Sequence, residues 1–321
     1  MGTIVYDWAV SGNVVPHVSF ILPARNEERF IGASIASIRQ HCAPDLLVEI
    51  IVVDHHSTDT TRDIARAAGA IVLEPDVATI AALRNEGAAA ALGNVFVFLD
   101  ADVTLTDAWQ RESRGVLQRV LQAPMALSGS NCDAPASGNW FLRYWFAEMS
   151  RDRDAPSLGS AHMIVPRDLF ERLRGFDARL QTGEDPDLCA RARKLGAPVT
   201  PEPSLRVIHH GYPVSAGSFI RRERWHGGGD TVSLERAVKS KVVWMSVAFI
   251  VLHLIVLGGS IVSGRLAMAG IILLLAHLYL SVRVRFRTMH GPTILKGMAM
   301  FYLYYVGRSL SFVSSQERGA R

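Results

Sequence analysis

Two acidic residues at the end of an apolar run constrain this chain more than any other feature. Val95–Leu99 has the composition of a buried strand, and Asp100 and Asp102 follow it directly. Side chains at positions i and i+2 of an extended segment point the same way, so both carboxylates are able to reach one divalent cation. Ligands of open α/β sheets collect at the carboxyl ends of the strands. The pair therefore predicts a cation site at a sheet edge, although Asp-x-Asp alone is a common tripeptide.

Apolar runs alternate with helical patterns over the first part of the chain. This alternation predicts an α/β fold, with a Rossmann-like, mostly parallel sheet and crossover helices. The expected buried strands are residues 18–22, 49–53, 70–73 and 95–99, and the expected helices are residues 28–41, 59–68 and 80–92. The first strand ends in Pro-Ala-Arg-Asn-Glu-Glu, where a dinucleotide-binding dehydrogenase carries a glycine-rich turn. A Rossmann oxidoreductase is therefore disfavoured.

The carboxyl-terminal part is strongly apolar, and we expect two domains, residues 1–235 and residues 236–321. Residues 242–262 carry no charged side chain and are long enough to span a bilayer, and residues 266–282 form a shorter apolar run. The two predict transmembrane helices in a hairpin, with a buried helical pair of a soluble protein as the alternative. Residues 294–313 contain two basic residues and three tyrosines, so we expect an interfacial helix there, with a third crossing as the alternative.

Basic residues flank the expected hairpin. Lys239 and Lys241 precede it and three arginines follow within residues 283–287, whereas the turn holds Arg265 alone. This asymmetry predicts that both ends of the hairpin face the cytoplasm. Residues 1–20 show no basic start followed by an apolar run, so no secretory signal is expected. We therefore expect an inner (cytoplasmic) membrane protein with its catalytic domain facing the cytoplasm.

Charge and cysteine content exclude other classes. Lys and Arg number 34 against 30 Asp and Glu, an excess too small to predict a nucleic-acid partner. Cys42, Cys132 and Cys189 match no zinc or thiol-redox spacing and are typical of buried side chains in a reducing compartment.

Several motifs together resemble the family 2 glycosyltransferases of the GT-A fold, over residues 17–230. They lie at the ends of the expected strands and in the third helix. The matching residues are Pro23, Arg25, Glu27, Asp54, Arg84, Asn85, Gly87, Asp100 and Asp102. His55 and His56 depart from the family, whose members often have small or polar residues there.

The resemblance implies a nucleotide-sugar site. Pro23, Arg25 and Glu27 would shape the nucleotide pocket, while Asp54 would accept a hydrogen bond from uracil. Arg84 would contact the base, the ribose or the diphosphate, as a guanidinium suits phosphate oxygens. The alternative for Asp54 is an ordinary turn or helix-capping acid.

The resemblance also implies a metal site. Asp102 would bind Mn²⁺ or Mg²⁺ directly, with Asp100 on the ribose or on the metal through water. His209 and His210 end another apolar stretch, and we take His210 as the candidate third ligand. A hydrogen-bonded core or surface histidine is the alternative.

Glu184 and Asp185 stand just before an expected helix, in a segment that resembles the acidic base motif of the family. An acceptor hydroxyl attacks poorly until its proton is accepted, and a carboxylate can accept that proton. We assign Asp185 as the general base, with Glu184 beside it. Capping of the helix and interaction with its dipole are the alternative role of these acids.

Arg221, Arg224 and Trp225 resemble the Gln-x-x-Arg-Trp element of processive members, with Arg221 replacing the glutamine. Arg224 would stabilise the departing diphosphate, and Trp225 would stack on an acceptor sugar or lie at the membrane interface. The missing glutamine argues against a polymerising synthase. Residues 227–229 are three glycines, which predict a flexible lid or a linker.

Together these features predict a metal-dependent, inverting glycosyltransferase of polysaccharide or glycolipid biosynthesis. It would move one sugar from a nucleotide-sugar donor, expected to be a UDP-sugar, to a lipid-linked or membrane-proximal acceptor hydroxyl. Alternatives are a polyprenyl-phosphate acceptor, and a non-catalytic membrane scaffold that binds nucleotide sugar.

Overall fold

The chain divides into two compact units, one comprising residues 1–135 and 150–211, the other residues 136–149 and 212–321. The computed structural model describes residues 17–122, 125–136, 140, 142–146, 158–231, 233–286 and 290–313. The domain boundary predicted at residue 235 falls inside the second unit. Arg287, one of the arginines used to orient the hairpin, lies outside the described residues.

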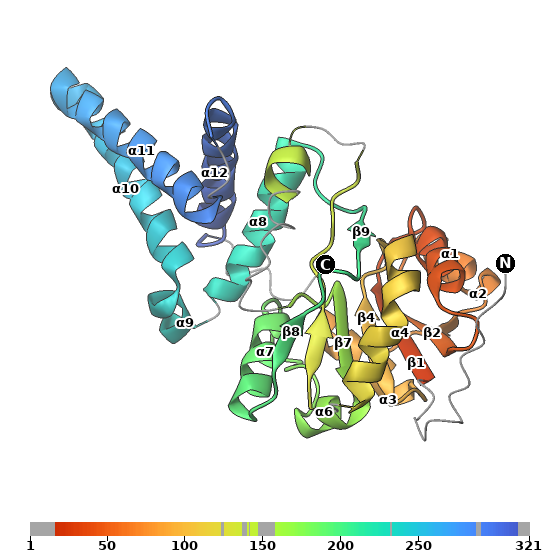
Figure 1. The fold of residues 1–321 in the computed structure, drawn as a ribbon. Coiled ribbons are helices and arrows are strands. Elements are labelled where there is room, and N and C mark those ends of the chain that lie inside the picture. The colour runs from red at the N-terminus through yellow and green to blue at the C-terminus, as the bar shows by residue number, and fades with distance from the viewer. Residues whose placement is uncertain are drawn as a thin grey trace. The chain divides into compact units, whose positions relative to one another are not determined.

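The first unit is built on a seven-stranded sheet with the order β3-β2-β1-β4-β7-β6-β8 (Figure 1). Strands β1 to β4 pair in parallel, β7 is antiparallel to β4 and β6, and β8 is parallel to β6. The strands are β1 (His17–Ala24), β2 (Leu47–Asp54), β3 (Ile71–Leu73), β4 (Val95–Leu99), β6 (Leu127–Gly129), β7 (His162–Pro166) and β8 (Val199–Pro201). The predicted mostly parallel sheet with crossover helices is confirmed.

Helices cover both faces of this sheet. One core contains Val18 and Phe20 of β1 and the helices α1 (Ile31–His41), α2 (Thr61–Ala67) and α4 (Asp107–Gln122). The other contains Ile21 of β1 and the helices α3 (Ile80–Ala90), α6 (Arg167–Arg172) and α7 (Glu184–Lys194). Alternate side chains of a strand point to opposite faces, so central strands with helices on both sides are apolar throughout. Each fully buried Val, Ile or Phe contributes about 1.5–3 kcal/mol.

Strand β3 differs from its prediction. Residues 70–73 were expected to form a buried strand, but Ile71 is 48% exposed. The cause is the position of β3 at the edge of the sheet, where it pairs with β2 alone.

A second, two-stranded sheet joins β5 (Val103–Leu105) and β9 (Val207–His209) in antiparallel fashion. Its register pairs Val103 with His209. Asp102, just before β5, is thereby held close to His209 at the end of β9.

The second unit is helical. Its elements are η2 (Leu142–Phe146), α8 (Ala216–Asp230), α9 (Leu234–Lys239), α10 (Lys241–Val262), α11 (Gly264–Arg285) and α12 (Thr293–Leu310). By length and composition, α10 and α11 are the two helices of the described part of the chain that could cross a membrane. They coincide with the two predicted apolar segments and pack against each other.

Helix α12 packs against α8 through small residues. A side chain at Gly307 would meet Glu223 and the backbone of α8, and one at Gly227 would meet Ser311. Arg308 adds ion pairs to Glu223 and Asp230. Residues 227–229, predicted to form a flexible lid or linker, therefore lie inside a helix, because this packing needs glycine at the contact.

Candidate active site

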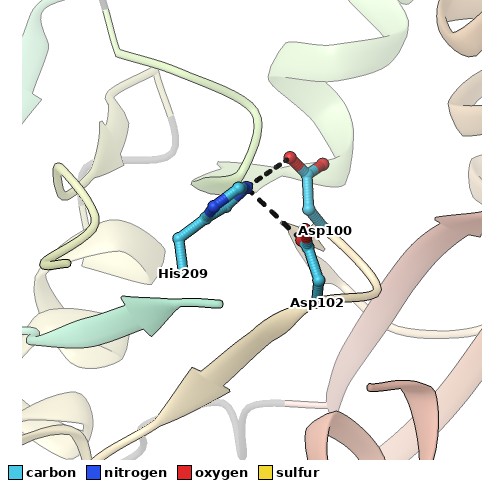
Figure 2. Close-up of side chains that lie close together, drawn as sticks. All are labelled: Asp100, Asp102 and His209. Atoms are coloured by element: carbon cyan, nitrogen blue, oxygen red, sulfur yellow. Dashed lines mark ion pairs between the residues drawn. The ribbon is translucent and has the colours of Figure 1, made fainter. Parts of the chain in front are cut away.

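Asp100, Asp102 and His209 converge in the first unit (Figure 2). One ligand atom from each lies within 4.8 Å of the other two, and His209 Nε2 lies 3.3 Å from Asp102 Oδ1 and 3.9 Å from Asp100 Oδ2. Burial and the charge of Asp100 raise the pKa of Asp102, which His209 partly offsets. Two carboxylates and one imidazole form a donor set that fits a divalent cation.

A turn, not an extended segment, brings the two aspartates together. Asp100 follows β4, and the amide of Val103 donates to the Asp100 carbonyl at 3.0 Å, which closes the turn. The hydroxyl of Ser34 on α1 donates to the carbonyl of Ala101 at 2.7 Å. The loop at residues 100–102 is thus fixed by α1 in the core, and its two carboxylates lie beside His209 (Figure 2).

The two histidines at the end of β9 have different environments. His209 lies in the acidic cluster, whereas His210 is the third ligand predicted from the sequence. His210 Nε2 lies 2.9 Å from the hydroxyl of Thr104, and its ring stacks on Phe30. The geometry therefore favours His209 as the third ligand and gives His210 the hydrogen-bonded role considered as the alternative. The pairing of β5 with β9 brings both histidines next to Asp102, and no local sequence signal reveals that pairing.

Gly211 permits the position of the Asp102 carboxylate. A Cβ at this position would lie 1.7 Å from Asp102 Oδ2, which is impossible without displacing the carboxylate. We expect Gly211→Ala to weaken Mn²⁺ binding by about 10-fold to 100-fold, the range seen when groups that orient metal ligands are lost. Isothermal titration with Mn²⁺ checks this, with Gly228→Ala as control because a Cβ at Gly228 meets open space. Equal affinities in both variants would contradict the role.

Glu27 adds a third acid near the cluster. Burial, together with Asp102, Asp100 and Asp59, raises its pKa to about 7. So many carboxylates in one partly buried region repel each other, and a cation would relieve that repulsion. Of the other residues predicted to shape the nucleotide pocket, Pro23 is buried at the end of β1 and Arg25 is exposed after it.

Asp54 is fully buried at the end of β2. Its carboxylate accepts hydrogen bonds from the amide and hydroxyl of Ser57, with Arg62 3.9 Å away. This geometry is that of the turn named as the alternative, and the contact with uracil stays a prediction.

Arg84 is also buried. It donates from Nη1 to Glu184 Oε1 and from Nη2 to Asp100 Oδ1, each at 2.8 Å. Arg84 was predicted to contact the donor, but both of its terminal nitrogens are engaged by carboxylates.

Asp185 lies beside Glu184 in the first turn of α7. Burial and Glu184 raise its pKa to about 6, while Arg84 and hydrogen bonds from Ser160 lower it. Its Oδ1 is buried without a hydrogen-bond partner among the described residues. A carboxylate with a raised pKa and an unpaired oxygen has the properties of a general base. Ser160 was missed from the sequence because it is far from Asp185 along the chain.

Arg221, Arg224 and Trp225 lie on α8 of the second unit, and all three are exposed. The opposite side of α8 is buried through Phe219, Glu223 and Gly227. The three predicted residues therefore share the outer surface of this helix.

Comparison with known proteins identifies a glycosyltransferase domain in the first unit. Residues 19–118 match the sequence model of the Glycosyl transferase family 2. The chain is 26% identical over 257 residues to the glycosyltransferase AglE of Haloferax volcanii, covering 74% of this chain and 83% of AglE. It is 27% identical over 244 residues to the pre-mycofactocin glycosyltransferase of Mycobacterium tuberculosis, covering 70% of this chain and 49% of that protein.

Two solved structures have a similar fold. The mannosyltransferase PcManGT from Pyrobaculum calidifontis, in complex with GDP-Man and Mn²⁺, has a TM-score of 0.60 and 18% identity, over 94% of this chain and 88% of that one. GalNAc-T7 with UDP, GalNAc and Mn²⁺ has a TM-score of 0.50 and 16% identity, over 67% of this chain and 50% of that one. The fold thus defines a GT-A α/β enzyme domain. Residues 19–118 form a family 2 glycosyltransferase domain, and the protein is a glycosyltransferase.

Proposed function

We propose that this protein transfers one sugar, with inversion, from a nucleotide-sugar donor to a lipid-linked or membrane-proximal acceptor hydroxyl. The observation that carries the proposal is the convergence of Asp100, Asp102 and His209 at the end of β4. Arg84 bridges Asp100 to Glu184, the neighbour of Asp185. The sequence resemblance favours a UDP-sugar as donor. The Mn²⁺ complexes of PcManGT and GalNAc-T7 support a metal-dependent reaction.

Mn²⁺ or Mg²⁺ would be held by Asp100, Asp102 and His209, and it would neutralise the diphosphate of the donor. Asp185 accepts the proton of the acceptor hydroxyl as that oxygen attacks the anomeric carbon. Ser160 stabilises the ionised form of Asp185 and orients it. A single displacement on the face opposite the leaving group inverts the anomeric carbon.

The hairpin of α10 and α11 supports action at a membrane. Both helices are 22 residues long and mostly apolar. We propose that the hairpin anchors the protein in the inner membrane with the first unit in the cytoplasm, where nucleotide sugars are made. A lipid-linked acceptor fits this location, since its sugar would be presented at the membrane surface.

The acid side of the pH profile is expected to lie near pH 6. Because burial raises the pKa of Asp185 to about 6, the protonated, inactive form of this base persists to higher pH than for an ordinary aspartate. Below that pH, kcat/KM should fall by about tenfold per pH unit. Initial rates between pH 5 and pH 8 check this, and a rate that stays constant down to pH 5 would contradict the assignment.

The proposed reaction is tested with the purified full-length protein. It is incubated with a panel of UDP-sugars and GDP-sugars, Mn²⁺ and a native lipid extract, and the products are identified by mass. We expect one donor to give a lipid whose mass increases by a single sugar. Binding of donor without any transfer would instead indicate a non-catalytic scaffold.

A further inference from the structure

Arg84 connects two parts of the first unit that are distant in sequence. It lies on α3, and its guanidinium bridges Asp100 after β4 and Glu184 at the start of α7, at 2.8 Å to each. Its side chain is 2% exposed. The end of the central strand and the helix that carries Asp185 are therefore joined through one buried side chain.

The charge of Arg84 is retained in this position. Burial lowers the pKa of Arg84, but Asp100, Asp185 and Glu184 outweigh burial and raise it. A planar guanidinium presents its donors in a fixed fork, so two engaged terminal nitrogens fix both carboxylates relative to each other. Its remaining nitrogen, Nε, is buried and has no partner among the described residues. Donors remain on the guanidinium, but a side chain that is 2% exposed presents almost no surface to a phosphate.

We propose that Arg84 is a positioning residue that sets the separation between the cation-binding carboxylate Asp100 and the base-bearing start of α7, and that it does not bind the donor. This inference rests on the proposed function. Glu184 is fixed by Arg84, and the adjoining Asp185 is fixed in turn through the backbone of α7 and through Ser160. The unpaired Oδ1 of Asp185 is then held where it can accept a proton.

The charges around Asp185 determine how the pH profile should change when Arg84 or Glu184 is substituted. Glu184 raises the pKa of Asp185 and Arg84 lowers it, and the neighbouring Cys189 thiol is neutral because burial raises its pKa. Removal of the Arg84 charge should therefore raise the pKa of the base. Removal of the Glu184 charge should lower it.

Two substitutions of Arg84 separate charge from geometry. Arg84→Met removes both, whereas Arg84→Lys keeps a charge but cannot bridge two carboxylates in a fixed plane. We expect kcat to fall by about 100-fold in both variants, as when a general base is misplaced. With Mn²⁺ at a saturating concentration for each variant, the KM for the donor should change by less than about threefold, because catalytic geometry changes and donor binding does not. The acid limb of kcat/KM should move to higher pH in Arg84→Met and less in Arg84→Lys.

A donor-binding role for Arg84 predicts the reverse pattern. In that case KM would rise by more than tenfold, with kcat at saturating donor and the acid limb both unchanged, and the inference would be overturned. Because Arg84→Met places an apolar side chain between two acids and risks misfolding, Glu184→Gln provides an independent test. It keeps an oxygen acceptor for Arg84 and should move the acid limb to lower pH; an unmoved limb would contradict the coupling.

The failure of this inference is distinguishable from failure of the proposed function. If the wild-type protein transfers no sugar, the proposed function fails, and Arg84 is then tested by titration of UDP or GDP, without Mn²⁺, into wild-type protein and Arg84→Lys. Affinities within about threefold support a positioning role. A loss of more than tenfold assigns Arg84 to the nucleotide site and overturns the inference.

Discussion

Exchange of Asp102 for asparagine is expected to lower the rate of sugar transfer by about a thousandfold. Asp102 Oδ1 and His209 Nε2 lie 3.3 Å apart, and asparagine would replace one charged ligand of this site with a neutral amide. Loss of a metal contact removes several kcal/mol of transition-state stabilisation, and about 4 kcal/mol corresponds to a thousandfold. The measurement is the initial rate at saturating donor and Mn²⁺.

Asp107→Asn is the matched control for this substitution. Asp107 belongs to the same unit, at the start of α4, but its side chain is 78% exposed and lies outside the cluster. Its exchange should leave the rate within about twofold, since surface substitutions have small effects. If both variants were equally active, Asp102 would have no part in the reaction.

Asp185→Asn is expected to reduce kcat by about 100-fold to 10,000-fold, the contribution of a positioned general base. The amide cannot accept the proton of an acceptor hydroxyl. Asp187→Asn is the control, because Asp187 lies in the same turn of α7 and is paired with Arg191.

The residual rate of Asp185→Asn also distinguishes a hydroxyl acceptor from a phosphate acceptor. A phosphate is already ionised near neutral pH and needs no strong base, so Asp185→Asn would then keep substantial activity. Retention of more than about a tenth of the wild-type rate would contradict a hydroxyl acceptor and favour a polyprenyl phosphate.

The ends of the strands are the part of the site that was predictable from the sequence. Val95–Leu99 is apolar throughout because helices cover both faces of β4, and Asp100 and Asp102 necessarily follow at its carboxyl end. The approach of His209 and His210 to Asp102 depends on the pairing of β5 with β9, which no local pattern encodes.

Burial and long-range ion pairs explain the other differences. Arg84 and Glu184 are 100 residues apart, so neither sequence pattern indicates that the two pair. Asp54 has the residue type of a base-binding acid, yet Ser57 three positions later satisfies it locally. Residues 227–229 have the composition of a flexible segment, but they lie inside α8, where Gly227 packs against α12. At Arg84 and Gly227 a tertiary contact overrides the local preference, whereas at Asp54 the decisive contact is local.

Direct measurement of Mn²⁺ binding tests the central claim, which is that Asp100, Asp102 and His209 form a functional cation site. Mn²⁺ is titrated into the purified protein in the presence of UDP or GDP, and the free ion is followed by electron paramagnetic resonance. The account predicts one tightly bound Mn²⁺ per chain, at least about tenfold weaker in Asp102→Asn. Absence of a bound ion, or an affinity that Asp102→Asn leaves unchanged, would contradict it.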